Sequence, residues 1–208
     1  MPIRGDREKA KEELCRILNR IGAIRFGTFR LTSGRVSPYY IDLRLVPSFP
    51  DTFHAVCSLY QQLIEEDVGT ENFDRVAGIP TAGLPFASVI AYKLRKPLLY
   101  VRKGVKLHGR ERRVEGALTP GDRVLLIDDL ITTGLSMRRA ALAVRAEGGV
   151  VEDAVVLLDR EEGGRRRLRE EGITLHCLLR ISEVAKKLYE MGAITREQRE
   201  IILRQVER

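Results

Sequence analysis

The sequence of 208 residues contains no tryptophan and only three cysteines, Cys15, Cys57 and Cys177. An odd number of widely separated cysteines is not a disulfide framework and favours a reducing compartment. No run of roughly 18 or more apolar residues is present, so no membrane-spanning helix is expected. The N-terminal stretch MPIRGDREKAKEEL lacks the apolar run of a signal peptide. These absences predict a cytoplasmic protein with no membrane partner.

Residues at metal-ligand spacing are also scarce. His54 lies near Cys57 and His176 lies beside Cys177, but neither pair is matched by a second pair at ligand spacing. We therefore expect these residues to be structural. The net charge is +7, with 28 Arg against 8 Lys. No basic stripe with interleaved aromatic residues accompanies this charge, which favours a small anionic ligand over nucleic acid.

The most informative stretch is VLLIDDLITTGLS, residues 124–136. An apolar strand over 124–127 precedes two acids, Asp128 and Asp129, and a small polar turn leads into a predicted helix over 135–147. Backbone N–H groups at such a turn, with the helix dipole, can hold a phosphate. The carboxylates repel phosphate but suit the vicinal hydroxyls of a sugar, and they could help to place a ligand-bound Mg²⁺. The stretch therefore predicts a ribose 5-phosphate site.

The strand, Asp128-Asp129 and Thr132-Thr133-Gly134 together resemble the diphosphoribosyl-binding motif of type I phosphoribosyltransferases. For this stretch taken alone, an ordinary strand–turn–helix is the alternative. Residues 26–44, FGTFRLTSGRVSPYYIDLR, predict two short strands around a turn. They resemble the N-terminal segment of orotate phosphoribosyltransferases, which forms a small hood over the base in that family. Two positions depart from the family's pattern. Many members carry Lys at the position of Thr32, and some bacterial relatives carry Lys at the position of Ala77.

Two stretches that follow predicted strands extend the resemblance. The turn Pro80-Thr81-Ala82-Gly83 resembles the family's turn beside the pyrophosphate, although any strand-to-helix turn could read this way. Residues 102–116 read as a solvated loop on charge alone. Their RKGVKLH sequence nevertheless resembles the family's R-K-x-x-K-x-H loop, which closes over the active site of the neighbouring subunit.

Arg160 stands at the end of a predicted strand, just before a pair of glycines. It resembles the family's arginine that binds the carboxylate or ring edge of orotate. A guanidinium suits a planar carboxylate because it can donate two parallel hydrogen bonds. A surface ion pair among the neighbouring charges is the alternative interpretation.

The order of elements predicts an α/β fold with a mainly parallel central sheet and helices on both faces. Ligands of such sheets bind at the carboxyl ends of the strands. The resemblance implies a type I phosphoribosyltransferase-like fold with a small N-terminal hood. We expect one phosphoribosyltransferase domain over 1–208, and its parts are a hood formed mainly by 1–46, a core over 51–180 and C-terminal helices over 182–207. Within these parts, helices are predicted over 7–21, 51–65, 83–95, 135–147, 182–191 and 196–206, and core strands over 75–79, 97–101, 124–127, 150–158 and 173–179.

By resemblance, the chain is expected to be an orotate phosphoribosyltransferase, a pentosyltransferase. Such an enzyme transfers the 5-phosphoribosyl group of phosphoribosyl pyrophosphate (PRPP) to orotate, giving orotidine 5′-monophosphate and pyrophosphate in de novo pyrimidine (UMP) synthesis. The resemblance also implies Mg²⁺ bound through PRPP, with no ligand directly from the protein except the possible help of Asp128 and Asp129. A homodimer that shares its lid loop across subunits is implied as well.

The expected roles of individual residues follow the motifs. The catalytic residues are expected to be Lys103, Lys106, His108, Asp128 and Asp129. Orotate is expected to contact Thr132 and Arg160. The residues expected to bind PRPP are Arg102, Lys103, Lys106, His108, Asp128, Asp129, Leu130, Ile131, Thr132, Thr133, Gly134, Leu135 and Ser136.

Two other functions stay open on the sequence. A transferase for another base would need a different hood, and Arg160 argues against it. An RNA-binding regulator with this fold would suit the positive charge, but it would leave the loop with Lys106 and His108 unexplained.

Lys106→Ala is expected to lower turnover by orders of magnitude with a modest loss of orotate binding, because Lys106 is assigned to the departing pyrophosphate. Steady-state kinetics together with orotate affinity measure both effects. Near-normal turnover would remove the loop from the mechanism.

Overall fold

The structure is a computed structural model that describes residues 7–30, 36–102 and 113–206. Asp6, which the sequence suggests as the cap of the first helix, and Thr32, Ser33 and Gly34 of the expected hood lie outside these ranges. The elements in chain order are α1 (Arg7–Arg20), β1 (Ile24–Arg30), β2 (Val36–Ile41), η1 (Leu43–Ser48), α2 (Pro50–Asp67), η2 (Thr70–Asn72), β3 (Arg75–Gly78), α3 (Gly83–Leu94), β4 (Leu98–Val101), β5 (Val114–Glu115), β6 (Val124–Ile131), α4 (Leu135–Ala146), β7 (Asp153–Asp159), α5 (Gly164–Glu170), β8 (Thr174–Arg180), α6 (Ile181–Glu190) and α7 (Arg196–Leu203).

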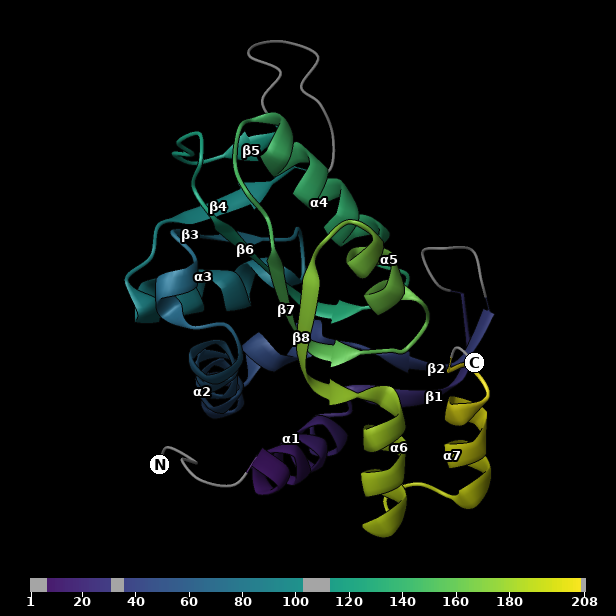
Figure 1. Cartoon of the computed structure of the whole chain (residues 1–208). Coiled ribbons are helices and arrows are strands. Elements are labelled where there is room, and N and C mark those ends of the chain that lie inside the picture. The colour runs from purple at the N-terminus through teal and green to yellow at the C-terminus, as the bar shows by residue number, and fades with distance from the viewer. Residues whose placement is uncertain (1–6, 31–35, 103–112, 207–208) are drawn as a thin grey trace.

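A central sheet carries the fold, with its strands in the order β5-β4-β3-β6-β7-β8 (Figure 1). Strands β4, β3, β6, β7 and β8 are parallel, and β5 pairs antiparallel with β4 at one edge. The predicted mainly parallel sheet is confirmed. Parallel neighbours need crossover connections, and helices α3, α4 and α5 supply them.

The side chains of β6 explain why helices cover both faces. Successive side chains of a strand point to opposite faces. Val124 and Leu126 pack in one buried cluster with residues of α4 and α5, whereas Leu125 and Ile127 pack in another with residues of α1, α2 and α3. A strand that is apolar on both sides therefore sits in the middle of three layers (Figure 1). This confirms the prediction of helices on both faces.

The N-terminal hairpin lies apart from the central sheet. β1 and β2 form an antiparallel pair with an irregularity between Phe26 and Phe29. Helix α7 packs against β2, so the C-terminal end of the described chain lies beside the hairpin (Figure 1). Thr195 and Gln198 form a capping box at the start of α7, as their spacing in the sequence predicts: the Thr195 hydroxyl accepts from the Gln198 N–H at 3.2 Å and the Gln198 side chain from the Thr195 N–H at 2.9 Å.

The end of β6 differs from the sequence-based expectation. The strand does not stop at Ile127 but continues to Ile131, because Leu130 and Ile131 keep pairing with β7. Asp128 and Asp129 thus belong to the strand and not to the turn. The prediction was wrong because it took the first charged residue as the strand end, whereas main-chain pairing does not depend on the side chain.

Other boundaries also shift. The expected loop over 102–116 contains the short strand β5, and helix α5 was not predicted because its seven residues include five charges and no clear period. β7 begins at Asp153 and not at 150. Ser48 ends the helix η1, and α2 begins at Pro50, one residue before the predicted start at 51. None of the helices in the described part of the chain is both long enough and apolar enough to cross a bilayer.

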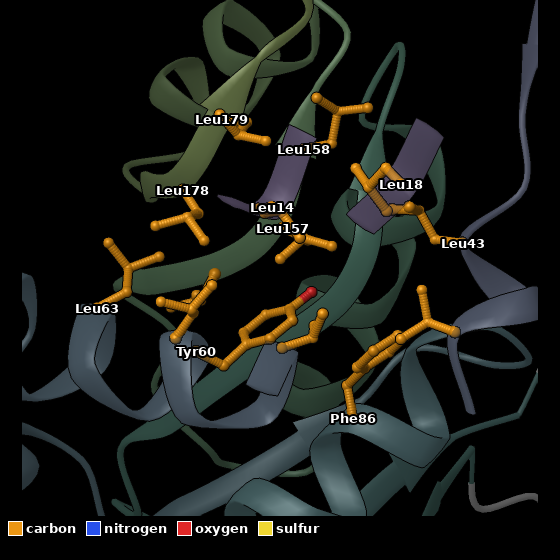
Figure 2. Packing of buried hydrophobic residues seen from close by; sticks show 14 of the residues in the cluster. Leu14, Leu18, Leu43, Tyr60, Leu63, Phe86, Leu157, Leu158, Leu178 and Leu179 are labelled. Carbon is orange, nitrogen blue, oxygen red and sulfur yellow. The ribbon is translucent and has the colours of Figure 1, made fainter. Parts of the chain in front are cut away.

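The larger core cluster is built around aromatic rings between α2 and α3. Tyr60 and Phe86 lie with their ring centroids 5.5 Å apart, and Phe53 meets Phe86 edge-on at the same separation. Figure 2 shows Tyr60 and Phe86 below a layer of leucines that includes Leu157. Aromatic pairs of this kind add to the stabilisation from buried apolar area.

Phe86→Ala is expected to lower the free energy of unfolding by about 3–5 kcal/mol, because it empties a fully buried site that its neighbours cannot fill. Urea unfolding measures the change. The control is Tyr92→Ala on the same helix, where the side chain is 85% exposed and a change within about 0.5 kcal/mol is expected. Equal losses in the two variants would contradict this assignment of the core.

Candidate active site

The topology of the sheet creates one place where a ligand can enter. From β3 the chain moves outward to β4, returns to the other side of β3 as β6 and then continues outward to β7 and β8. The connections after β3 and β6 therefore leave in opposite directions, and a crevice opens between them at the carboxyl ends of the strands. A cavity of about 600 Å³ lies there. Its walls come from the turn after β3, from residues 128–137, from the hairpin side over 40–44 with Arg30, and from Arg160 and Arg139.

The turn after β3 packs directly on the end of β6. Residues Pro80, Thr81 and Ala82 line the cavity, and the peptide bond between Pro80 and Thr81 is cis. A Cβ on Gly83 would lie 2.7 Å from the carbonyl oxygen of Ile127 and 2.8 Å from Cα of Asp128. Only glycine allows this approach. The turn that resembles a pyrophosphate-side turn is thereby fixed beside the first acid of the pair.

The acidic pair is held by its backbone as well as by its neighbours. The hydroxyl of the buried Tyr60 donates to the backbone carbonyl of Asp128 at 2.7 Å, and the Asp129 N–H donates to Oδ1 of Asp128 at 2.9 Å. Asp129 is only 8% exposed. Burial raises the pKa of its carboxyl, while hydrogen bonds from Asp128 and the backbone and the charge of Arg44 act in the opposite direction. Both carboxylates border the cavity, where they can accept hydrogen bonds from a ligand.

The turn between β6 and α4 has the features of an anion site. Gly134 has a φ of 75°, in the left-handed region that glycine adopts without strain, and it occupies the position before the first residue of α4. No side chain caps this helix. The N–H groups of the first turn of a helix have no partners within the helix and form the positive end of its dipole, so they can bind a phosphate.

The hairpin contributes a wall that the sequence-based site did not include. Arg44 donates from Nε and Nη2 to the two oxygens of Asp42, at 2.7 and 2.9 Å, and from Nη2 to the Tyr40 hydroxyl at 2.7 Å. The hydrogen bond from Arg44 lowers the pKa of Asp42. The alternation of side chains between the two faces of β2 is a sequence signal that could have identified this wall. Tyr39 and Ile41 are buried on one face, so Tyr40 and Asp42 must point to the other.

Arg160 lies in the interior and not on the surface. It is 3% exposed, and its Nη2 lies 2.9 Å from Oε1 of the equally buried Glu162. Its guanidinium stacks over the ring of Tyr39 at 4.7 Å and approaches Oγ of Ser37 at 3.5 Å. The surface ion pair considered for Arg160 is thus wrong. Within the described chain, Nε of Arg160 is buried without a hydrogen-bond partner, in a residue that lines the cavity.

The other candidate residues are not all found at the cavity. Arg102 pairs with Glu115 at 2.9 Å and is not among the residues that line the cavity. Lys103, Lys106 and His108 lie outside the described residues. All of residues 128–136 and Arg160 line the one cavity. Over 7–30, 36–102 and 113–206 no group of three or more side chains has the arrangement of a metal site, and His176 instead bonds to Asp153 at 2.7 Å.

Comparison with known proteins shows which family this chain resembles. A family model described as a phosphoribosyl transferase domain matches residues 49–192. The orotate phosphoribosyltransferase of Cenarchaeum symbiosum is 46% identical over 190 residues, covering 91% of this chain and 93% of that protein.

Solved structures agree with this similarity. The crystal structure of orotate phosphoribosyltransferase from Aeropyrum pernix superposes with a TM-score of 0.74 at 33% identity, covering 86% of this chain and 99% of that one. The Mycobacterium tuberculosis orotate phosphoribosyltransferase in complex with PRPP superposes with a TM-score of 0.65 at 26% identity, covering 84% and 98% of the two chains.

Asp129→Asn is expected to make the protein more stable than the wild type at pH 7. Burial raises the pKa of Asp129, so the folded state holds this proton to a higher pH than the unfolded chain. The stability that the protonated Asp129 carboxyl contributes is complete below the usual carboxyl pKa of about 3.9. It is lost as the pH rises through the pKa of Asp129 in the folded protein. Urea unfolding at pH 7 and near pH 4 should show an advantage for the variant that shrinks on acidification.

Asp42→Asn is the control for this pH dependence, because the hydrogen bond from Arg44 lowers the pKa of Asp42. Its carboxylate stabilises the fold above the unfolded pKa, so this variant should be the less stable one at pH 7. If both variants shifted stability in the same direction at pH 7, the assignment of burial as the dominant effect at Asp129 would be wrong.

Proposed function

The chain belongs to the phosphoribosyl transferase family and, within it, to the orotate phosphoribosyltransferases, and we propose that the cavity at the end of β6 is where it performs this reaction. The reaction transfers the 5-phosphoribosyl group of PRPP to orotate, with orotidine 5′-monophosphate and pyrophosphate as products, in pyrimidine biosynthesis. We further propose that residues 1–208 act as one domain, with the hood over 1–46, the core over 51–180 and C-terminal helices over 182–207.

One observation supports this location above all. An anion-binding turn, a pair of carboxylates and a buried arginine, which come from separate stretches of the sequence, line a single cavity. These three groups match the three parts of the product, namely a phosphate, a diol and a pyrimidine with a carboxylate.

The 5-phosphate is assigned to residues 131–136. The backbone N–H groups of this turn and of the first turn of α4 suit a doubly charged phosphate, and the hydroxyls of Thr132, Thr133 and Ser136 can add donors. The side chain of Leu135 is exposed, so its contribution is that of its backbone N–H. Leu130 contributes to the cavity wall before the turn.

The ribose hydroxyls are assigned to Asp128 and Asp129. Carboxylate oxygens accept hydrogen bonds from a vicinal diol, and the Asp129 oxygens are desolvated by burial, which strengthens such bonds. The same hard oxygen donors fit Mg²⁺, which prefers carboxylates, phosphates and water. Bound through PRPP, Mg²⁺ would neutralise part of the pyrophosphate charge, with these two carboxylates as the protein groups near it.

Orotate is assigned to Thr132 and Arg160. Among the described residues the Nε–H of Arg160 has no hydrogen-bond partner, and a guanidinium can bind a carboxylate in a two-pronged way. The contacts of Arg160 with Glu162 and Tyr39 restrict its rotation, so little side-chain entropy is lost on binding. Tyr40 of β2 and Arg44 of η1 line the cavity, and we assign them to the side of the base.

The chemistry needs no covalent nucleophile. C1′ of the ribose loses pyrophosphate and gains N1 of orotate through an oxocarbenium-like state, so catalysis rests on positioning and on stabilising the departing charge. We assign that charge to Lys103, Lys106 and His108, with Arg102 at the base of their loop. The loop would close over the site of the neighbouring subunit of a homodimer and exclude water. A cytoplasmic location belongs to the same proposal.

The direct test follows the loss of orotate absorbance with PRPP and Mg²⁺, with uracil and hypoxanthine in parallel. Consumption of orotate alone is expected. Activity with another base only would keep the fold but overturn the assignment of Arg160 and the hood. Inactivity with every base would contradict the enzymatic function.

Asp129→Asn is expected to weaken PRPP binding about tenfold or more, since it replaces a charged acceptor of the ribose hydroxyls by a neutral amide. Calorimetric titration of PRPP with Mg²⁺ measures the affinity. Asp51→Asn, an exposed change in the first turn of α2, serves as the control. Unchanged PRPP affinity in Asp129→Asn would count against the diol role.

A further inference from the structure

The carbonyl groups of the phosphate turn are occupied from behind the cavity. The Ile131 carbonyl accepts from the Arg160 N–H and the Thr132 carbonyl from the Gly164 N–H, both at 2.9 Å. The Thr133 carbonyl accepts from Nη1 of Arg167. Three consecutive carbonyls are therefore bonded to one stretch, residues 160–167, which we call the β7–α5 segment.

This arrangement matters for an anion site because each residue of a turn carries an acceptor as well as a donor. A carbonyl oxygen that faced the cavity would repel a phosphate and cancel the attraction of the N–H groups. Carbonyls bonded to the β7–α5 segment are directed away from the ligand. The donors behind the turn thus determine that a phosphate in the cavity meets the N–H groups of the turn and not its carbonyl oxygens.

The segment can reach the turn because it has no side chain at the point of contact. A Cβ on Gly164 would lie 2.6 Å from Cγ1 of Ile131 and 2.7 Å from the Thr132 carbonyl oxygen. Backbone therefore meets backbone. Arg167 supplies the third bond from its side chain, so it is the one donor of the three that a substitution can remove without changing the main chain.

Helix α5 does not depend on Arg167 for its own position. Leu168 is fully buried beneath it, and Glu171 at its end binds two arginines of α4, accepting from Arg138 at its side chain and from Arg145 at its carbonyl, the latter at 3.0 Å. Loss of the Arg167 contact should release the Thr133 carbonyl and leave the helix docked.

We propose that Arg167 is a positioning residue that holds the Thr133 carbonyl away from the 5-phosphate and so sets the affinity for the phosphoribosyl substrate. Among the described residues Arg167 does not line the cavity, so it acts through the turn and not by contact with the substrate. This inference rests on the proposed function, because it takes residues 131–136 as the 5-phosphate site.

The test compares Arg167→Met with Arg166→Met. Both replace an arginine of α5 by an unbranched apolar chain, but the Arg166 side chain is 67% exposed and its ion-pair partner is Glu170 on the same helix. For Arg167→Met, KM for PRPP and Kd for ribose 5-phosphate are expected to rise about tenfold, or about 1.4 kcal/mol. KM for orotate and Kd for pyrophosphate should change less than about twofold, and Arg166→Met should resemble the wild type throughout.

Arg167→Lys extends the test, because its ammonium can still donate to the carbonyl. It should give a KM for PRPP between those of the wild type and Arg167→Met. If thermal melting shows that Arg167→Met is not folded, Arg167→Lys is compared with Arg166→Met. The KM for PRPP is then expected to rise in Arg167→Lys and to stay unchanged in Arg166→Met. An unchanged KM for PRPP, or an equal loss for orotate, pyrophosphate and ribose 5-phosphate, would overturn the inference.

Gly134→Val separates this inference from the assignment on which it rests. A Cβ at this position would lie 3.1 Å from the Gly164 carbonyl oxygen, and a β-branched residue does not tolerate the φ of 75°, so Val would distort the turn itself. Unchanged ribose 5-phosphate affinity in Gly134→Val would mean that the turn is not the phosphate site, and the proposed site would fail. Lost affinity in Gly134→Val with normal affinity in Arg167→Met would reject the role of Arg167 alone.

Discussion

The structure depends on how the last half of β6 is fixed. Beyond Leu126 its main chain is bonded by several parts of the chain that are distant in sequence. The Ile79 N–H donates to the Ile127 carbonyl at 3.0 Å, the Tyr60 hydroxyl to the Asp128 carbonyl and the Arg160 N–H to the Ile131 carbonyl. β3 pairs with β6 as far as Ile127 and β7 pairs with it as far as Ile131, so the side chains at the end of the strand cannot move far. The two carboxylates and the turn over 131–136 consequently line one cavity in a fixed relation, which suits the proposed binding of a phosphoribosyl group.

Carboxylates hold two of the arginines that line the cavity in place. Arg44 is bonded to Asp42, and Arg160 to Glu162, so each of these arginines has its own carboxylate neighbour. An arginine fixed in this way loses less conformational freedom on meeting an anion than a solvated one. The burial of Asp129 has the opposite effect, since desolvation raises the pKa of its carboxyl and makes the ionised form costly for the folded protein. Functional sites commonly retain such local instability.

Local patterns predicted the elements well where a periodic signal was strong, as in α1, α4 and the apolar strands. They were poorer where main-chain pairing overrode side-chain character. β6 continues through Asp128 and Asp129 because Asp128 and Leu130 still pair with β7, and no feature of two adjacent acids shows this. Helix α5 is too short and too charged to carry an amphipathic period of its own, and its burial rests on Leu168. The hairpin wall with Tyr40, Asp42 and Arg44 was missed because its significance depends on which face of β2 meets the cavity.

The sequence by itself determined the class of fold, the motif of acids, threonines and glycine over 128–134, and the family to which the chain belongs. Such information is local, since neighbouring residues specify a strand, a turn and a helix start through their own propensities and hydrogen-bonding groups. Only the tertiary structure decided that Arg160 is buried against Glu162 and Tyr39, and that Arg167 bonds the Thr133 carbonyl. These contacts join residues 30 or more positions apart or depend on burial. They arise from the order of strands in the sheet, which places the ends of β3, β6 and β7 side by side.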